Sequence, residues 1–507
     1  MKKISIKIPA ILLVAASTFV SCSKLKEEPK SIIVEENFYN TQADAIAAVT
    51  AVYNTLNSDP LADFPIYGRN LNLLIGNGSD DQVFSPSNTN PDVRALGTTT
   101  YIAANDRVKK IWTQHYFGIS RANVAIDKIP LIDFTPVLRS RLTNEAKYIR
   151  ALLYFNLVRL HGAVPLILHD PTTVNVEELK VGRTPVDSVY KQIIADLTDA
   201  TTLPNSYAAA ADRGRVTSGA AHALLAKVYV TRQDWPNALS ELQKVITAGT
   251  LPGATGVYNY DLFDKFTDAF QKATKNGKEH IFSVQFETNL GAKNTQNFVS
   301  SGNFSSFNPS VYAGDIPDER LVQIFDDADT RKSGSFFQKL LNPATGQVVD
   351  FGSTWRFSKF IDFSLSPLVN QAQSGLNYPV QRYADVLLLY AETVNELNGP
   401  TADAYAAINL VRQRAYGVYK TANHDHDLTA ALSQSDFRDS VFLERRKEFV
   451  LESNRWFDLV RSHKLVEALK KIPAKASNVS DKNYLYPVPQ VEIDLNPKLK
   501  PQNPGWE

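Results

Sequence analysis

Two adjacent carboxylates, Asp80 and Asp81, follow a Gly-Asn-Gly-Ser segment at residues 76–79. Ionised carboxylates accept hydrogen bonds, so a loop that exposed both could hold a hydroxylated ligand. Turn chemistry alone would also explain these residue types, because turns favour Gly, Asn, Asp and Ser. With that alternative open, Asp80 and Asp81 are the best polar candidates for ligand contact.

Aromatic side chains in predicted loops could supply the other half of such a site. A sugar ring has apolar faces on which aromatic rings stack, while carboxylates accept from its hydroxyl groups. For every candidate, packing in the core is the alternative. The candidates are Tyr101, Phe304, Phe307, Tyr312 and Trp355.

Catalytic motifs are missing from the sequence. It contains no H-E-x-x-H, no G-x-S-x-G, no P-loop and no dinucleotide fingerprint. We therefore expect a binding protein, with no enzyme activity and no cofactor. Paired carboxylates that hydrolyse glycosidic bonds need not form a motif, so a glycoside hydrolase stays an alternative.

Three charged clusters invite a metal or catalytic interpretation, and each has a structural one. The clusters are HDHD at 424–427, DDAD at 326–329 and ERRKE at 444–448. Ligands at i and i+2 converge poorly on one ion, and the second cluster lacks the glycine and final glutamate of an EF-hand loop. Glu444 and Glu448 are four residues apart, which favours ion pairs on a helix. We expect no metal site.

The single cysteine, Cys22, follows a segment typical of export signals. Lys2, Lys3 and Lys7 precede the apolar stretch 8–20, which is shorter than the roughly 20 residues that a bilayer span needs. The segment resembles the lipobox of bacterial lipoproteins, with Phe19 where leucine is usual. This implies acylation of Cys22; an ordinary secretory peptide with an incidental cysteine is the alternative.

Composition narrows the class of protein. The chain has 54 Lys and Arg against 53 Asp and Glu, a formal charge of +1. Nucleic-acid binding needs a basic excess or stripe to neutralise phosphates, so we expect no nucleic-acid partner. One cysteine in 507 residues excludes an internal disulfide and a multi-cysteine metal site.

Helical periodicity dominates the elements that must position these residues. Apolar spacings of three and four predict buried helices at 144–160 and 186–200. Ala226 and Ala238 lie twelve residues apart in a predicted helix pair, with Ser218 as an N-cap, a spacing typical of tetratricopeptide repeats. The segments 386–392 and 404–409 repeat the pattern. Long polar stretches at 58–105 and 287–315 are where we expect a ligand.

Ten blocks occur in order along the chain. They are NEAKYIRA at 144–151, HGAVPL at 161–166, the segment 189–204, the helix pair around Ala226 and Ala238, RYADVLLLYAE at 382–392, INLVRQRA at 408–415, ERRKEF at 444–449, RWFDLVR at 455–461, LYPVP at 485–489 and QNPGW at 502–506. Together these blocks resemble the SusD/RagB family of outer-membrane nutrient-binding lipoproteins.

The resemblance implies a mainly α fold of tetratricopeptide-like helix pairs with long loops and a few short strands. It also implies a charged network of ERRKE with Arg455 and Asp458. The expected organisation is a signal peptide at 1–21, a lipidated flexible tether at 22–36, an N-terminal helical region at 37–250 and a C-terminal region at 251–507, packed as one body.

The function that the resemblance implies is nutrient capture at the outer membrane, on the outer face of the cell. An oligosaccharide is the expected ligand, delivered to a SusC-like TonB-dependent transporter barrel, with the membrane reached through the lipid anchor. Two other functions stay open: a lipid-anchored glycoside hydrolase, and a helical-repeat scaffold for envelope protein assembly.

Overall fold

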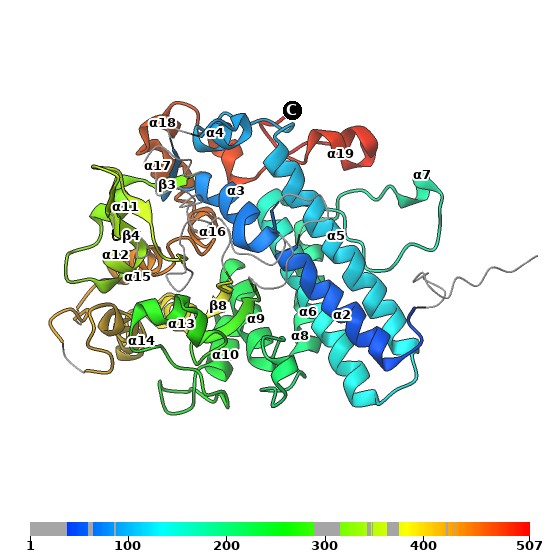
Figure 1. Cartoon of the computed structure of the whole chain (residues 1–507), viewed down its shortest axis with the longest axis horizontal. Helices are drawn as coiled ribbons and strands as arrows, with labels where there is room; N and C mark the ends of the chain where they lie inside the picture. Colours follow the sequence, from blue (N-terminus) through cyan, green and yellow to red (C-terminus); the bar gives the residue numbers. More distant parts are fainter. Residues whose placement is uncertain are drawn as a thin grey trace, which may run out of the picture.

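Long helices packed side by side build most of the molecule (Figure 1). The computed structural model describes residues 38–58, 64–85, 88–287, 315–341, 346, 348–361, 375–421, 424–429 and 431–507. The predicted fold class, mainly α with a few short strands, is confirmed. The predicted signal peptide and tether lie outside the described residues.

The N-terminal helices form one block around α6 (Pro136–His161). Helices α5 (Asp106–Lys128) and α8 (Val186–Ala200) pack against α6, and α2 (Gln42–Asn57) packs against both α5 and α6. The predicted buried helix is confirmed, and it begins earlier than residue 144. It ends at Gly162, whose φ of 72° favours glycine.

The predicted pair of helices with closely spaced alanines is confirmed as α9 (Ser218–Thr231) and α10 (Trp235–Val245), which pack together. Ala226 and Ala238 are both fully buried. The N-cap of α9 is Thr217, one residue before the predicted cap, and its side chain accepts from the Ala220 amide.

A second helix pair, α13 (Tyr383–Asn398) and α14 (Ala402–Ala415), confirms the repeated pattern. Helix α10 packs on α13, which also contacts α15 (Gln434–Glu448). The two helical regions are thereby joined through α10 and α13, as Figure 1 shows in green and ochre.

Strands are short and pair only in twos within the described residues. All four pairs are antiparallel; β1–β3 and β2–β8 join segments distant in sequence, whereas β5 and β6 are close along the chain. They are β1 (Gln82–Phe84) with β3 (Asp315–Pro317), β2 (His280–Val284) with β8 (Tyr378–Arg382), β4 (Phe336–Phe337) with β7 (Arg356–Phe357), and β5 (Lys339–Leu341) with β6 (Val348–Asp350).

The stretch 58–105, predicted as a long polar loop, contains helices of its own. Helix α3 (Leu71–Asn77) is buried along its whole length, which a solvent loop would not be. The elements beside it are η2 (Ile66–Asn70), β1 and α4 (Pro91–Gly97). The prediction of a loop was therefore wrong for much of this stretch, whereas 288–314 lies outside the described residues.

Short helices complete the C-terminal region. They are α11 (Glu319–Gln323), α12 (Thr330–Ser335), α16 (Arg455–Arg461), α17 (Leu465–Lys470), α18 (Pro473–Ala476) and α19 (Gln490–Leu495). One hydrophobic core runs through both halves of the described chain, from Ala45 to Trp506. Among the helices described, none has the length and apolarity to cross a membrane.

Candidate functional site

The structure places three of the predicted ligand residues in the interior. Asp80 and Asp81 are 5% and 6% exposed, and Tyr101 is 3% exposed, stacked between the rings of Tyr486 and Trp506. Trp355 is partly buried against the core. The remaining predicted residues, Cys22, Phe304, Phe307 and Tyr312, lie outside the described residues.

Asp80 and Asp81 occupy an ion-pair cluster with two arginines of the C-terminal region. Arg455 binds Asp80 through two nitrogens at 2.8 and 2.9 Å, and Arg446 binds Asp81 at 2.7 Å. Burial alone would raise the pKa of Asp80, but Arg455 and Arg446 hold it well below its usual range. This placement favours a role in holding the body together over direct contact with a ligand.

Lys475 fastens the same loop from the other side. Its buried ammonium donates to the carbonyl oxygens of Asn77 at 2.7 Å, Ser79 at 2.5 Å and Gln82 at 3.0 Å. Burial lowers the pKa of Lys475 to about 8. The carbonyl oxygens in and beside the Gly-Asn-Gly-Ser segment are therefore bound by the Lys475 side chain of α18, and the segment is not an open turn.

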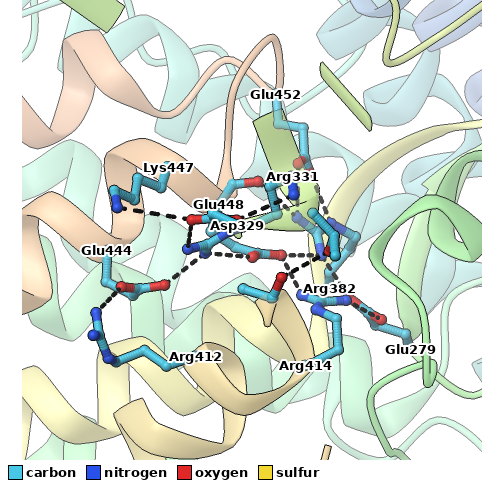
Figure 2. Close-up of polar contacts among 12 residues, drawn as sticks. Glu279, Asp329, Arg331, Arg382, Arg412, Arg414, Glu444, Lys447, Glu448 and Glu452 are labelled. Carbon is cyan, nitrogen blue, oxygen red and sulfur yellow. Dashed lines mark hydrogen bonds and ion pairs between the residues drawn. The ribbon is translucent and has the colours of Figure 1, made fainter. Parts of the chain in front are cut away.

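A larger buried network surrounds Glu448, the last residue of α15 (Figure 2). Its carboxylate contacts Arg414 at 2.5 Å, Arg382 at 2.9 Å and Arg331 at 3.2 Å. Burial would raise the pKa of Glu448, but these three guanidinium groups keep it well below its usual range. The network ties β8, α12, α14 and α15 to one another.

The neighbours of Glu448 in the network are charged and buried as well. Glu444 binds Arg331 at 2.6 Å and Arg412 at 2.9 Å, and Glu279 binds Arg382 and Arg414. Each carboxylate labelled in Figure 2 forms an ion pair with an arginine or a lysine. With its buried charges paired in this way, the network is suited to holding the segments together.

The cluster ERRKE pairs across elements and not along its own helix. Arg445 turns to Asp385 at 2.7 Å and Asp458 at 3.0 Å, and Arg446 turns to Asp81. The expected network with Arg455 and Asp458 is thus present: Arg445 binds Asp458, and Arg446 and Arg455 share Asp80 at 3.1 and 2.8 Å. The i, i+4 explanation was wrong because adjacent side chains on α15 face different segments of the fold.

The other two charged clusters have their own protein partners. Asp427 accepts from the Gln413 side chain, and Asp329 binds Arg331 at 2.8 Å. Asp326 accepts from two amides of its own turn, those of Ala328 and Asp329. Among the described residues, no group of three or more His, Cys, Asp or Glu side chains is placed to hold a metal.

A surface cavity of about 440 Å³ lies beside the N-terminus of α9, and we call it the Tyr260 cavity. Segments 205–217, 257–260 and 275–283 line it. The rings of Tyr258 and Tyr260 stack with their centroids 5.3 Å apart. Their hydroxyl groups meet Ser218 at 2.8 Å and Thr217 at 3.3 Å, so both rings are fixed in place.

The sequence analysis did not identify the Tyr260 cavity. Its residues come from three segments that carry no motif, and none of them contains one of the predicted ligand residues. The closest signal is Tyr258-Asn259-Tyr260, a pair of aromatic residues around an amide. That signal says nothing of Arg213 or Lys278, which only the fold brings to the same place.

Two families of known proteins match this chain, one in its N-terminal half and one in its C-terminal part. The SusD family matches residues 351–506, and the family described as starch-binding associating with outer membrane matches residues 66–230. SusD-like protein P2 of Formosa agariphila is 28% identical over 534 residues, which cover 100% of each chain.

Solved structures give the same result. A SusD homologue from Bacteroides thetaiotaomicron has a TM-score of 0.79 at 24% identity, covering 93% of this chain and 98% of that one. A laminarin-binding SusD-like protein has a TM-score of 0.73 at 26% identity, covering 92% of this chain and 100% of that one. Sequence and fold thus match the same group of proteins over nearly the entire chain.

Proposed function

This chain belongs to the SusD/RagB family, and from that premise we propose that it binds an oligosaccharide at the cell surface without altering it. The observation that carries the proposal is the end-to-end similarity, which leaves no large part of the chain for another activity. The laminarin-binding relative supports a glycan as the ligand class.

The proposal includes an outer-membrane location and a transporter partner. Acylation of Cys22 would anchor the protein, and the predicted tether 22–36, which includes the polar run 23–29, would let the body rest over a SusC-like TonB-dependent barrel. The bound oligosaccharide would then pass to that barrel. The description of the family that matches residues 66–230 supports association with the outer membrane.

For the contacts with the glycan we propose aromatic stacking. Trp355, partly buried against the core, and the predicted Phe304, Phe307 and Tyr312 are the candidates. The carboxylates of Asp80 and Asp81 are paired with Arg455 and Arg446, so we do not include them among the proposed glycan contacts.

A screen of soluble glycans, including laminarin and starch, tests the binding proposal. Isothermal titration calorimetry on the purified chain should give saturable heat with at least one glycan, and chromatography of the same mixtures should show no shortened product. Appearance of product would favour the lipid-anchored hydrolase. A chain that binds no glycan but copurifies with envelope proteins would favour the scaffold.

The partner proposal needs its own experiment. Gentle detergent extraction of the lipidated protein, followed by affinity purification, should recover a much larger outer-membrane barrel in stoichiometric amount. Extraction of a non-lipidated chain from the periplasm serves as the control for detergent carry-over. Recovery of the lipidated protein alone would contradict the proposed partner.

A further inference from the structure

The Tyr260 cavity combines positive charge with a fixed aromatic surface. Arg213, Arg215, Lys275 and Lys278 line it, whereas among the described residues no Asp or Glu does. Its volume of about 440 Å³ lies within the roughly 300–1,000 Å³ usual for small-molecule sites. The cavity therefore favours a ligand that carries negative charge.

The cations differ in how firmly the protein already holds them. Arg215 is committed to Glu145 at 2.8 Å. Lys278 lies 3.2 Å from Asp264 and 3.7 Å from Asp261, whose side chains are 82% and 29% exposed, and ion pairs at such exposed sites contribute little, so this ammonium can turn to another anion. Arg213 is exposed and forms no ion pair with any described residue. Arg213 and Lys278 are thus available to an anion.

Uncharged groups in the cavity complete a saccharide site. The exposed side chain of Asn205 can meet ring hydroxyl groups. The Tyr260 ring stacks on Tyr258 and lies 6.3 Å from the ring of Tyr383, and its exposed part can pack against an apolar sugar face. Ser283, 3% exposed, has a hydroxyl oxygen without a hydrogen-bond partner among the described residues. A buried polar group left unpaired calls for an explanation, and a bound ligand would supply the missing hydrogen-bond partner.

We propose that the Tyr260 cavity binds a saccharide bearing an anionic group, with Arg213 and Lys278 on the charge and Tyr260 against the ring. The inference rests on the proposed function in taking the ligand to be a saccharide. It adds a second set of saccharide contacts, beside those proposed for Trp355, Phe304, Phe307 and Tyr312, and the charge class. The anionic group could be a uronate carboxylate or a sulfate ester, since both accept charge-assisted hydrogen bonds from Arg and Lys.

Matched trisaccharides test the proposal by calorimetry on the full chain. Trigalacturonate, a galactotriose sulfated at its sixth carbons and unmodified galactotriose, all with the same linkage, differ only in the group at the sixth carbon: a carboxylate, a sulfate ester or a hydroxyl. We expect one charged form to bind about tenfold more tightly than the neutral one, with the advantage shrinking as salt is raised. The charged form that binds identifies the anionic group.

Substitutions assign the binding to this cavity. Arg213→Gln and Lys278→Gln should each weaken binding of the charged trisaccharide by about tenfold. Lys265→Gln, an exposed cation outside the cavity, is the matched control and should leave binding unchanged. Since both target side chains are exposed, the melting temperature should stay that of the parent chain.

Each alternative outcome overturns something definite. Equal affinity for charged and neutral trisaccharides, or variants that bind like Lys265→Gln, would overturn this inference. If neutral glycans of the wider screen still bind, the proposed function survives that failure. If neither the charged trisaccharides nor any glycan of the screen binds, both the inference and the proposed function fail.

Discussion

Arg455 donates two hydrogen bonds to Asp80, at 2.8 and 2.9 Å, although 375 residues separate the two along the chain. The pair joins the loop after α3 to the start of α16. A bidentate guanidinium–carboxylate contact has defined geometry as well as strength, so it fixes the orientation of both segments. Substitution of Asp80, a predicted ligand residue, therefore tests whether its contact with Arg455 stabilises the fold.

Asp80→Asn should destabilise the protein and leave glycan affinity of the folded fraction intact. The substitution leaves the buried Arg455 with only Asp81, at 3.9 Å, as its ion-pair partner, at a cost of about 3 kcal/mol of unfolding free energy. Urea unfolding and calorimetry measure the two effects. Asp327→Asn, which breaks the exposed pair with Lys332, is the control and should change stability by less than about 1 kcal/mol. Lost binding at unchanged stability would instead place Asp80 in the ligand site.

Glu448→Gln should be more damaging, because three arginines share that carboxylate. We expect a loss of about 3–5 kcal/mol in unfolding free energy, or failure to fold. Thermal unfolding measures it, with Glu467→Gln as the control in the exposed pair with Lys471. Similar melting temperatures for the two variants would contradict the role given to the network.

Two buried histidines should make the protein less stable in mild acid. Burial lowers the pKa of His115 to about 4 and that of His161 to about 3, against about 6.5 in an unfolded chain. Unfolding therefore takes up protons below about pH 6.5, and stability is lost as pH falls from there toward the folded values. The loss per histidine approaches about 1.4 kcal/mol per pH unit.

Unfolding measured between pH 7 and 5, above most carboxylate titration, isolates this effect. His115→Gln should show a shallower dependence on pH than the parent chain. His169→Gln, at a site with an 80% exposed side chain, should show the parent slope. Parallel curves for all three proteins would disprove the explanation.

Ala226→Leu should weaken the packing of α9 against α10. Ala226 is fully buried on α9, which packs against α10, and a larger side chain in this close-packed interior should cost about 1–3 kcal/mol. Chemical unfolding gives the change. Ala209→Leu, at an exposed position before α9, should be close to neutral. A neutral Ala226→Leu would show that the helices do not need the small residue.

Cys22→Ser tests the anchor. The variant should no longer be found in the membrane fraction and should not incorporate labelled palmitate, because serine offers no thiol for acylation. Its unfolding curve and glycan affinity should match those of the parent chain, since residue 22 lies ahead of Phe38, where the described residues begin. Continued membrane retention would contradict lipidation at this residue.

Local sequence determined the helices and their pairing well. The apolar stripe of α6, the glycine after His161 and the alanines of α9 and α10 act over a few residues, so their pattern survives in the linear chain. Similarity in ordered blocks then indicated the family, because the blocks follow one another at the spacing that the whole fold requires.

Tertiary structure alone decided which polar residues face solvent. The local sequence around Asp80, Asp81 and Tyr101 would be the same in an exposed loop and in a core. These side chains are buried because the fold packs Arg446, Arg455 and Trp506 against them. In the Tyr260 cavity, folding has the opposite effect: it brings cations from separate segments together at the surface. Helix formation depends on neighbours in sequence, whereas burial and charge pairing depend on segments hundreds of residues away.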